Sequence, residues 1–192
     1  MLIKVESAAP YCLEGLGVTA EVNIVSRGLP RFDIIGLPSK AVEESRHRIK
    51  AALMNLNIGF PYDRKITVNL APADVPKQGS FYDLPIAAGI MALNSGVNLP
   101  KDALFFGEVS LDGGVKYVQG AFLLGLYARD SKYTSVFVPE ENSAEVASIP
   151  GIKVFSVSNL RQLNNHLTGA HVLAEFDGGK VSLVKDSSAR HL

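Results

Sequence analysis

The segment from Lys65 to Gly89 constrains the fold more than any other part of the sequence, because it joins a strand pattern to a helix pattern. Residues 66–70 alternate apolar and polar, which predicts a half-buried strand. Residues 71–80 then break all periodicity with two prolines and a glycine. An apolar run at helical spacing begins at Asp83, which we predict to be the N-cap of a helix. Side chains and backbone N–H groups meet where these elements join, so this is the first candidate site.

Composition fits one soluble globular domain, since 47% of the 192 residues are hydrophobic and 20% are charged. The 19 basic and 19 acidic residues balance, which excludes a global basic field for nucleic acid but leaves a local patch open. Cys12 is the single cysteine, so neither an internal disulfide nor a multi-cysteine metal site is expected. No segment resembles a signal peptide or a membrane span, and we predict a cytoplasmic protein without a membrane partner.

The N-terminal third carries strand patterns, glycine-rich turns and one helix pattern. Gly15 and Gly17 predict the turn between the first two strands, and two Gly-Leu-Pro tripeptides flank the third strand. Ser39 is the predicted N-cap of the helix, and Gly59 its predicted C-cap. The predicted elements are strands at 2–6, 18–25 and 32–35 and a helix at 39–57.

Beyond the central helix, strands and helices alternate, which predicts an α/β domain with some parallel strands. Ser158 is the predicted N-cap of the last helix. From Thr168 onward the sequence is polar and predicts a flexible tail. The predicted elements are strands at 104–111, 115–118, 135–139 and 152–157, a hairpin turn at 112–114, and helices at 119–129, 142–148 and 158–167.

Nucleotide and metal motifs are missing from the sequence. There is no GxxxxGK[ST] loop, no GxGxxG between a strand and a helix, and no HExxH. We therefore predict no cofactor and no metal in this chain.

The polar residues of the central loop are the candidate functional residues: Asp74, Lys77, Ser80 and Asp83, with Glu108 from the next strand. Ser80 and Lys77 are the alternative catalytic pair, because a desolvated lysine can act as a base for a serine nucleophile. The competing interpretation is that these side chains satisfy backbone groups of the loop and cap the helix, which requires no chemistry. We favour that interpretation.

A second set of candidates is basic. Arg27, Arg31, Arg46, Arg48 and Lys50 lie in the Gly-Leu-Pro loops and on the 39–57 helix, and they are candidates for binding phosphate or docking a partner. The alternative is an ordinary solvated face, which is the more common role of such clusters.

Four segments carry a resemblance to a known family: GLPRFDIIGLPSKAVEESRHRIKAAL, NLAPADVPKQGSFYDLPIAAGIMAL, FFGEVSLDGGVKYVQGAF and VPEENSAEV. They resemble the N-terminal domain of the ComM/YifB family, the magnesium-chelatase-like AAA+ ATPases. The resemblance implies an α/β, ribosomal-S5-domain-2-like fold, as in the Lon proteolytic domain, with a mixed sheet and helices packed on it. It also implies a domain over residues 1–169 and a tail or linker over 170–192 toward an absent ATPase domain.

The same resemblance bears on catalysis. Lon-type peptidases place a serine at the start of the central helix and a lysine in a later Gly-Gly-Leu-Lys segment. In this chain Asp83 stands at the serine position and Phe122 at the lysine position. Both members of the dyad are replaced, so the resemblance predicts no peptidase activity for this chain.

For function, the resemblance implies a non-catalytic accessory domain of a hexameric, ATP-dependent DNA helicase that promotes branch migration in natural transformation. ATP and Mg²⁺ would belong to the full-length protein, as would ring assembly and the DNA partner. With that function, Arg27, Arg31, Arg46, Arg48 and Lys50 become the candidate DNA contacts of this chain. The alternatives are a residual Ser80–Lys77 hydrolase and a magnesium-chelatase-related accessory protein.

Overall fold

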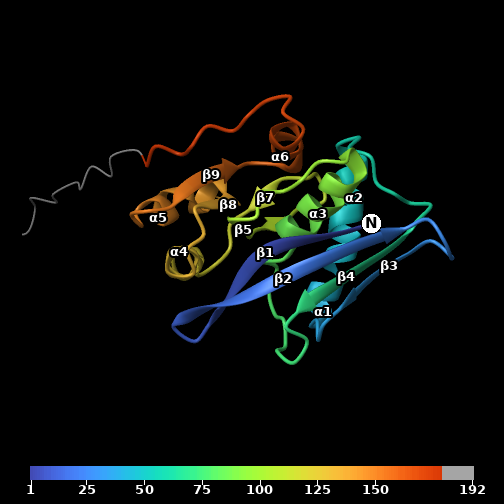
Figure 1. The fold of residues 1–192 in the computed structure, drawn as a ribbon, viewed down its shortest axis with the longest axis horizontal. Helices are drawn as coiled ribbons and strands as arrows, with labels where there is room; N and C mark the ends of the chain where they lie inside the picture. The colour runs from blue at the N-terminus through green and yellow to red at the C-terminus, as the bar shows by residue number, and fades with distance from the viewer. Residues whose placement is uncertain (179–192) are drawn as a thin grey trace, which may run out of the picture.

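The computed structural model describes residues 1–178, which form a mixed sheet with helices packed on it (Figure 1). The strands are β1 (Leu2–Tyr11), β2 (Glu14–Val25), β3 (Arg31–Ile35), β4 (Lys65–Ala71), β5 (Ala103–Phe105), β6 (Glu108–Val109), β7 (Val115–Lys116), β8 (Ser135–Pro139) and β9 (Lys153–Val157). The helices are α1 (Lys40–Glu43), α2 (Ser45–Asn55), α3 (Asp83–Ser95), α4 (Ala121–Asp130), α5 (Ser143–Ala147) and α6 (Leu160–Leu167), with a 3-10 turn η1 (Glu140–Asn142).

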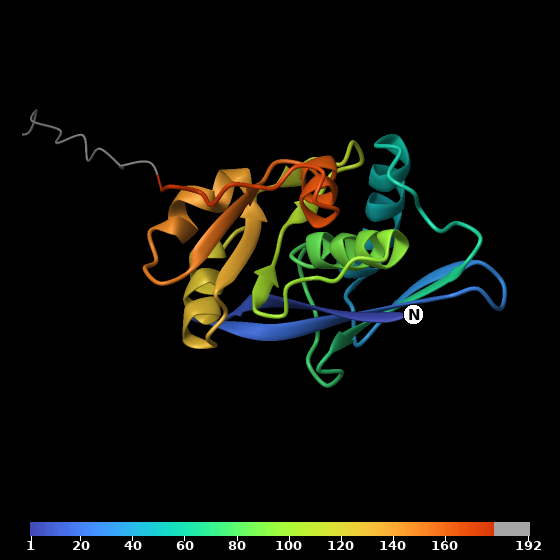
Figure 2. The ribbon, with the colours of Figure 1, turned by 45° about the horizontal axis from the view of Figure 1, so that its top comes forward.

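Seven strands form the main sheet in the order β3-β4-β2-β1-β5-β8-β9, and β6 and β7 form a separate hairpin. The β4–β2 and β2–β1 pairs are antiparallel, whereas β3–β4, β1–β5, β5–β8 and β8–β9 are parallel. This confirms the predicted mixed α/β sheet. In Figure 2, α3 lies along one face of the long β1–β2 hairpin, and α6 lies above α3.

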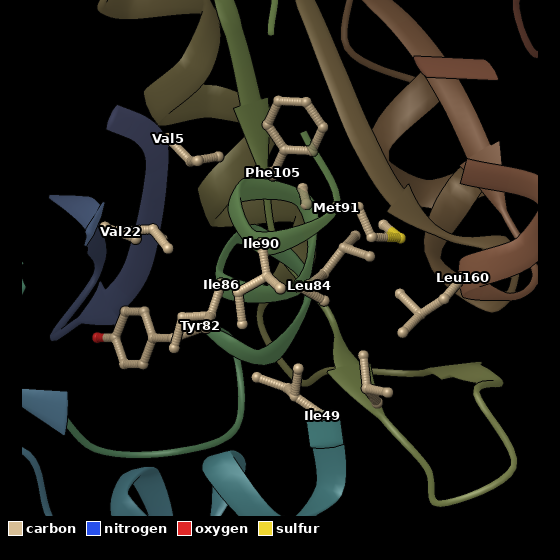
Figure 3. Close-up of a cluster of buried hydrophobic side chains, with 14 of the residues drawn as sticks. Val5, Val22, Ile49, Tyr82, Leu84, Ile86, Ile90, Met91, Phe105 and Leu160 are labelled. Atoms are coloured by element: carbon tan, nitrogen blue, oxygen red, sulfur yellow. The ribbon is translucent and has the colours of Figure 1, made fainter. Parts of the chain in front are cut away.

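The central helix α3 is the core of the molecule, because every residue from Asp83 to Ala92 is buried. Figure 3 shows its apolar side chains between Val5 and Val22 of the sheet, Ile49 of α2 and Leu160 of α6. Because α3 is apolar around its whole circumference, neighbouring elements must bury it on every side.

The β1–β2 hairpin is longer than predicted, since its pairing continues from Leu2↔Asn23 to Tyr11↔Glu14. The predicted turn at Gly15 and Gly17 is wrong, because both glycines lie within β2. A Cβ at Gly15 would stand 2.3 Å from Cβ of Tyr127, and one at Gly17 2.1 Å from its hydroxyl. These glycines therefore make room for α4 rather than forming a turn.

The predicted 39–57 helix is divided at Glu44 into α1 and α2. Ser39 is the N-cap, as predicted, and its Oγ accepts from the Val42 N–H at 3.4 Å. The predicted C-cap at Gly59 is wrong: the chain leaves the helix at Asn57, which has a φ of 53°. Asn tolerates this left-handed conformation better than most residues.

Two later predictions also need correction. The 104–111 strand is interrupted at Gly107, whose N–H donates to the Phe81 carbonyl while its own carbonyl accepts from the Leu84 N–H, both at 3.0 Å. The chain therefore turns toward the start of α3 before the β6–β7 hairpin. The N-cap of α6 is Asn159 rather than Ser158, because the Asn159 Oδ1 accepts from the Gln162 N–H at 2.9 Å.

The first part of the predicted 170–192 tail packs on the domain. Leu173 is buried, and its N–H donates to Nδ1 of His166 at 3.0 Å. The Phe176 N–H donates to the Val154 carbonyl at 2.7 Å. The rest of the predicted tail, residues 179–192, lies outside the described residues. None of the helices described is long and apolar enough to cross a membrane.

Candidate functional site

The start of α3 holds a buried ionic cluster around Asp83, whose side chain is fully buried. The Arg48 guanidinium donates from Nε to Oδ2 at 2.8 Å and from Nη2 to Oδ1 at 3.0 Å. The Ser45 hydroxyl also donates to Oδ1, and the Val109 N–H donates to Oδ2 at 3.1 Å. One carboxylate thus ties α3 to α2 and to the β6–β7 hairpin.

The predicted role of Asp83 as an N-cap is wrong. Tyr82 occupies the cap position and makes no side-chain cap hydrogen bond. The Leu84 N–H is satisfied instead by the Gly107 carbonyl at 3.0 Å. Because the Gly107 carbonyl satisfies this N–H group at the start of α3, the carboxylate of Asp83 is available to bind Arg48.

Two opposing effects act on the ionisation of Asp83. Burial raises the pKa of this carboxyl, whereas hydrogen bonds from Arg48 and Ser45, the charge of Arg48 and the Val109 N–H lower it. The hydrogen bond to Asp83 raises the pKa of Arg48 above its already high value. The partners of Oδ2 are obligate donors, so the site suits a carboxylate paired with a guanidinium.

The central loop sends Ser80 and Lys77 to different partners. The Ser80 hydroxyl donates to Oε2 of Glu108, and the Lys77 ammonium donates to the Pro72 carbonyl. Lys77 is buried, and burial lowers the pKa of its amine while the charge of Asp74 opposes that shift. Asp74 is itself exposed. Within residues 1–178, no hydrogen bond joins Ser80 to Lys77.

Backbone contacts fix the position of this loop. The Lys77 N–H donates to the Leu37 carbonyl at 3.0 Å, and the Ser39 N–H donates to the Lys77 carbonyl at 2.9 Å. The second Gly-Leu-Pro loop is therefore attached to the central loop. Phe122, at the position where the resemblance places a lysine in Lon-type peptidases, lies in the first turn of α4 with 42% of its surface exposed. Asp83 itself is fully buried among residues 1–178 and is not exposed to a substrate.

The structure separates the five basic candidates. Arg48 is committed to Asp83, as described above. Arg27 is exposed in the β2–β3 loop, and Arg46 makes a 3.4 Å contact from Nε to Nε2 of His47. Arg31 and Lys50, in contrast, line the same pocket.

This pocket, here called the β3–β4 pocket, lies at the starts of β3 and β4 and has a volume of about 160 Å³. The Lys50 ammonium stands 5.8 Å from the centroid of the Phe60 ring. Its principal lining side chains are Arg31, Phe32, Lys50, Phe60, Tyr62 and Arg64.

Sequence reasoning missed Arg64, Tyr62 and Phe60. One signal could have found them: β3 and β4 are parallel, with Arg31 opposite Lys65. Residues that immediately precede two paired parallel strands meet at the same edge of a sheet. Applied to the predicted strands at 32–35 and 66–70, this rule places Lys65 opposite Arg31 and Arg64 one residue earlier in the chain at the same edge.

Comparison with known proteins identifies relatives for most of the chain. The family model described as subunit ChlI of Mg-chelatase matches residues 20–142. Protein YifB of Salmonella typhimurium is 39% identical over 159 residues, 81% of this chain and 31% of that protein. Competence protein ComM of Haemophilus influenzae is 37% identical over 174 residues, 90% of this chain and 34% of ComM. The chain thus spans about one third of the length of these relatives.

A more distant similarity connects the chain to Lon proteases. The Lon protease of Rhizobium meliloti is 28% identical over 155 residues, 75% of this chain and 19% of the protease. Together with the mixed sheet, this match confirms the predicted Lon-like fold class.

Proposed function

This chain belongs to the family described as subunit ChlI of Mg-chelatase and is a relative of ComM and YifB, and from this premise we propose that it is a non-catalytic accessory domain that contacts DNA. The protein that it serves would be a ComM-like, ATP-dependent helicase acting in branch migration during natural transformation. In this proposal ATP, Mg²⁺ and assembly into a hexameric ring belong to parts of the protein outside this chain, and residues 170–192 lead toward them.

The burial of Asp83 supports the non-catalytic part of the proposal. A Lon-like enzyme needs an accessible nucleophile at the start of the central helix, whereas Asp83 is enclosed by Arg48, Ser45 and the Val109 N–H. The alternative Ser80–Lys77 hydrolase gains no support, since each side chain has another partner.

The observation that carries the DNA-binding part is the convergence of Arg31, Lys50 and Arg64 on one exposed pocket. Phosphate contacts by lysine and arginine supply most of the sequence-independent affinity for DNA. The chain has no net charge, so a local cluster of this kind is where such contacts would form. The proposal also includes Arg27, which is exposed, and Arg46, which is half-buried, and it omits Arg48 because Asp83 occupies that guanidinium.

A titration of the 192-residue chain with duplex and forked DNA at two salt concentrations tests this proposal. We expect binding at low salt that weakens steeply as salt is added. The double variant Arg31→Gln/Lys50→Gln should bind more weakly and depend less on salt, while Arg129→Gln, an exposed arginine of α4, should behave like the original chain. Absence of binding at low salt would contradict the proposal that this domain contacts DNA.

A further inference from the structure

The β3–β4 pocket combines positive charge with aromatic surface. Its three cations come from separate parts of the chain: Arg31 begins β3, Lys50 lies on α2, and Arg64 ends the loop before β4. The side chain of Arg31 is 72% exposed and that of Arg64 41% exposed. Lys50 forms no ion pair with any residue from 1 to 178. This arrangement presents several donors to one anion.

The aromatic residues differ in how much of their surface is free. Phe60 is buried and tilts against Phe32, with ring centroids 6.1 Å apart, so these two rings form the floor. Tyr62 is 74% exposed and stacks on no other ring in the described part of the chain. Its large apolar face is therefore available to a ligand.

Backbone hydrogen bonds hold this side of the pocket in a tight turn. The Tyr62 N–H donates to the Phe60 carbonyl at 2.8 Å, and the Arg64 N–H donates to the Pro61 carbonyl at 3.2 Å. The backbone that carries Tyr62 and Arg64 is thus ordered before any ligand arrives, which lowers the entropic cost of binding.

We propose that the β3–β4 pocket binds one unpaired nucleotide of single-stranded DNA, with its base against Tyr62 and its phosphate among Arg31, Lys50 and Arg64. This inference rests on the DNA contact in the proposed function and goes further by naming the form of DNA. In a duplex the base faces are covered by neighbouring pairs, whereas an unstacked base can lie on an aromatic side chain. A pocket with both ring and cations therefore suits a single strand.

Two acidic residues compete with the phosphate. Asp33 pairs with Arg31, with Oδ1 2.6 Å from Nε, and Asp63 lies 4.0 Å from Nε of Arg64. Both pairs are partly exposed to solvent, and such pairs contribute little net stability. An arriving phosphate can replace these carboxylates at small cost.

Fluorescence anisotropy of the 192-residue chain tests the inference with three probes of equal length: labelled oligodeoxythymidine, its duplex with oligodeoxyadenosine, and an abasic single strand with the same number of phosphates. We expect the oligodeoxythymidine to bind more tightly than either of the others. The abasic strand isolates the contribution of the base from that of the phosphates.

The variants isolate the ring and the charge. Tyr62→Leu should weaken binding of oligodeoxythymidine about tenfold, as expected for loss of one stacked base, whereas Tyr62→Phe keeps the ring and should bind like the original chain. Arg64→Gln should lower the log–log salt dependence by about 0.7. Arg129→Gln is the matched control, because its side chain is also 41% exposed and also adjoins an aspartate.

The outcomes separate the binding of an unpaired nucleotide from the broader proposal that the domain contacts DNA. If the duplex binds as tightly as the single strand, or Tyr62→Leu binds like Tyr62→Phe, the unpaired nucleotide is excluded while DNA contact by the domain survives. If the abasic strand binds as tightly as oligodeoxythymidine, the pocket recognises phosphate alone and the proposed contact between the base and Tyr62 is contradicted. If no probe binds at low salt, both proposals fail.

Discussion

Arg48 and Lys50 stand two residues apart on α2 and have opposite surroundings. Arg48 reaches into the interior, where its guanidinium holds the buried carboxylate of Asp83. Lys50 faces solvent over the Phe60 ring and lines the β3–β4 pocket. Helix geometry separates their directions, since residues two apart do not share a face. The same basic cluster in the sequence therefore divides into a structural part and a part available to a ligand.

The most stringent test of this comparison is to remove one aspartate from the buried cluster and one from the exposed pocket. Asp83→Ala should lower the free energy of unfolding by about 3 kcal/mol, because it leaves Arg48, Ser45 and the Val109 N–H without their common partner. The Arg48 side chain is 23% exposed, so its guanidinium can still contact water in the variant. The expected loss of stability is therefore at the lower end of the range for buried ion pairs. Urea unfolding followed by circular dichroism measures the change.

Asp33→Ala is the control for that experiment. It breaks the Arg31–Asp33 pair, whose side chains are 72% and 21% exposed, and should cost less than about 1 kcal/mol. Equal losses for the two variants would contradict the distinction between a buried cluster and an exposed pocket.

His166 offers a test by pH. Burial lowers the pKa of its imidazole, and its Nδ1 accepts from the Leu173 N–H, so the folded state prefers the neutral ring. A base whose folded pKa lies below its unfolded value contributes stability above the unfolded pKa and loses it as pH falls. Stability should therefore decline as pH drops below about 6.5.

Urea unfolding across this pH range, for the original chain and for His166→Gln, checks the prediction. The variant should lack this component of the decline, and an equal decline in both would assign it to other groups. His171, which is exposed, provides the second control through His171→Gln, a variant that should retain the decline.

A small effect is also expected at Lys77, a buried cation whose amine bonds to a carbonyl rather than to a carboxylate. Lys77→Met should change the free energy of unfolding by less than about 1 kcal/mol at neutral pH, because removal of a costly buried charge offsets the lost hydrogen bond. Thermal unfolding measures it. A loss as large as that of Asp83→Ala would mean that Lys77 also holds the fold together.

Local signals in the sequence predicted local structure well. The alternation at 66–70 gave β4, Ser39 caps α1, and the turn at 112–114 joins β6 to β7. Each of these depends on residues a few positions apart. The predicted domain boundary at residue 169 stays a prediction, although packing continues to Phe176.

Predictions failed where a distant partner decides the outcome. Asp83 has the residue type and position of an N-cap, but its partner Arg48 lies 35 residues earlier in the chain. Gly15 and Gly17 are typical turn residues, yet Tyr127 of α4 is what requires them. Arg64 escaped notice because only the pairing of β3 with β4 brings it to Arg31.

The most direct test compares two variants of α2 in two measurements, urea unfolding and binding of oligodeoxythymidine. Ser45→Ala removes a donor to Asp83 and should lower the free energy of unfolding by about 1 kcal/mol without changing DNA affinity. Lys50→Gln should change the free energy of unfolding by less than about 1 kcal/mol. The same variant should bind DNA more weakly, and its DNA affinity should depend less on salt. If Ser45→Ala weakens DNA binding in a folded chain, or Lys50→Gln leaves it unchanged, the division of α2 into a structural side and a DNA-contacting side is contradicted.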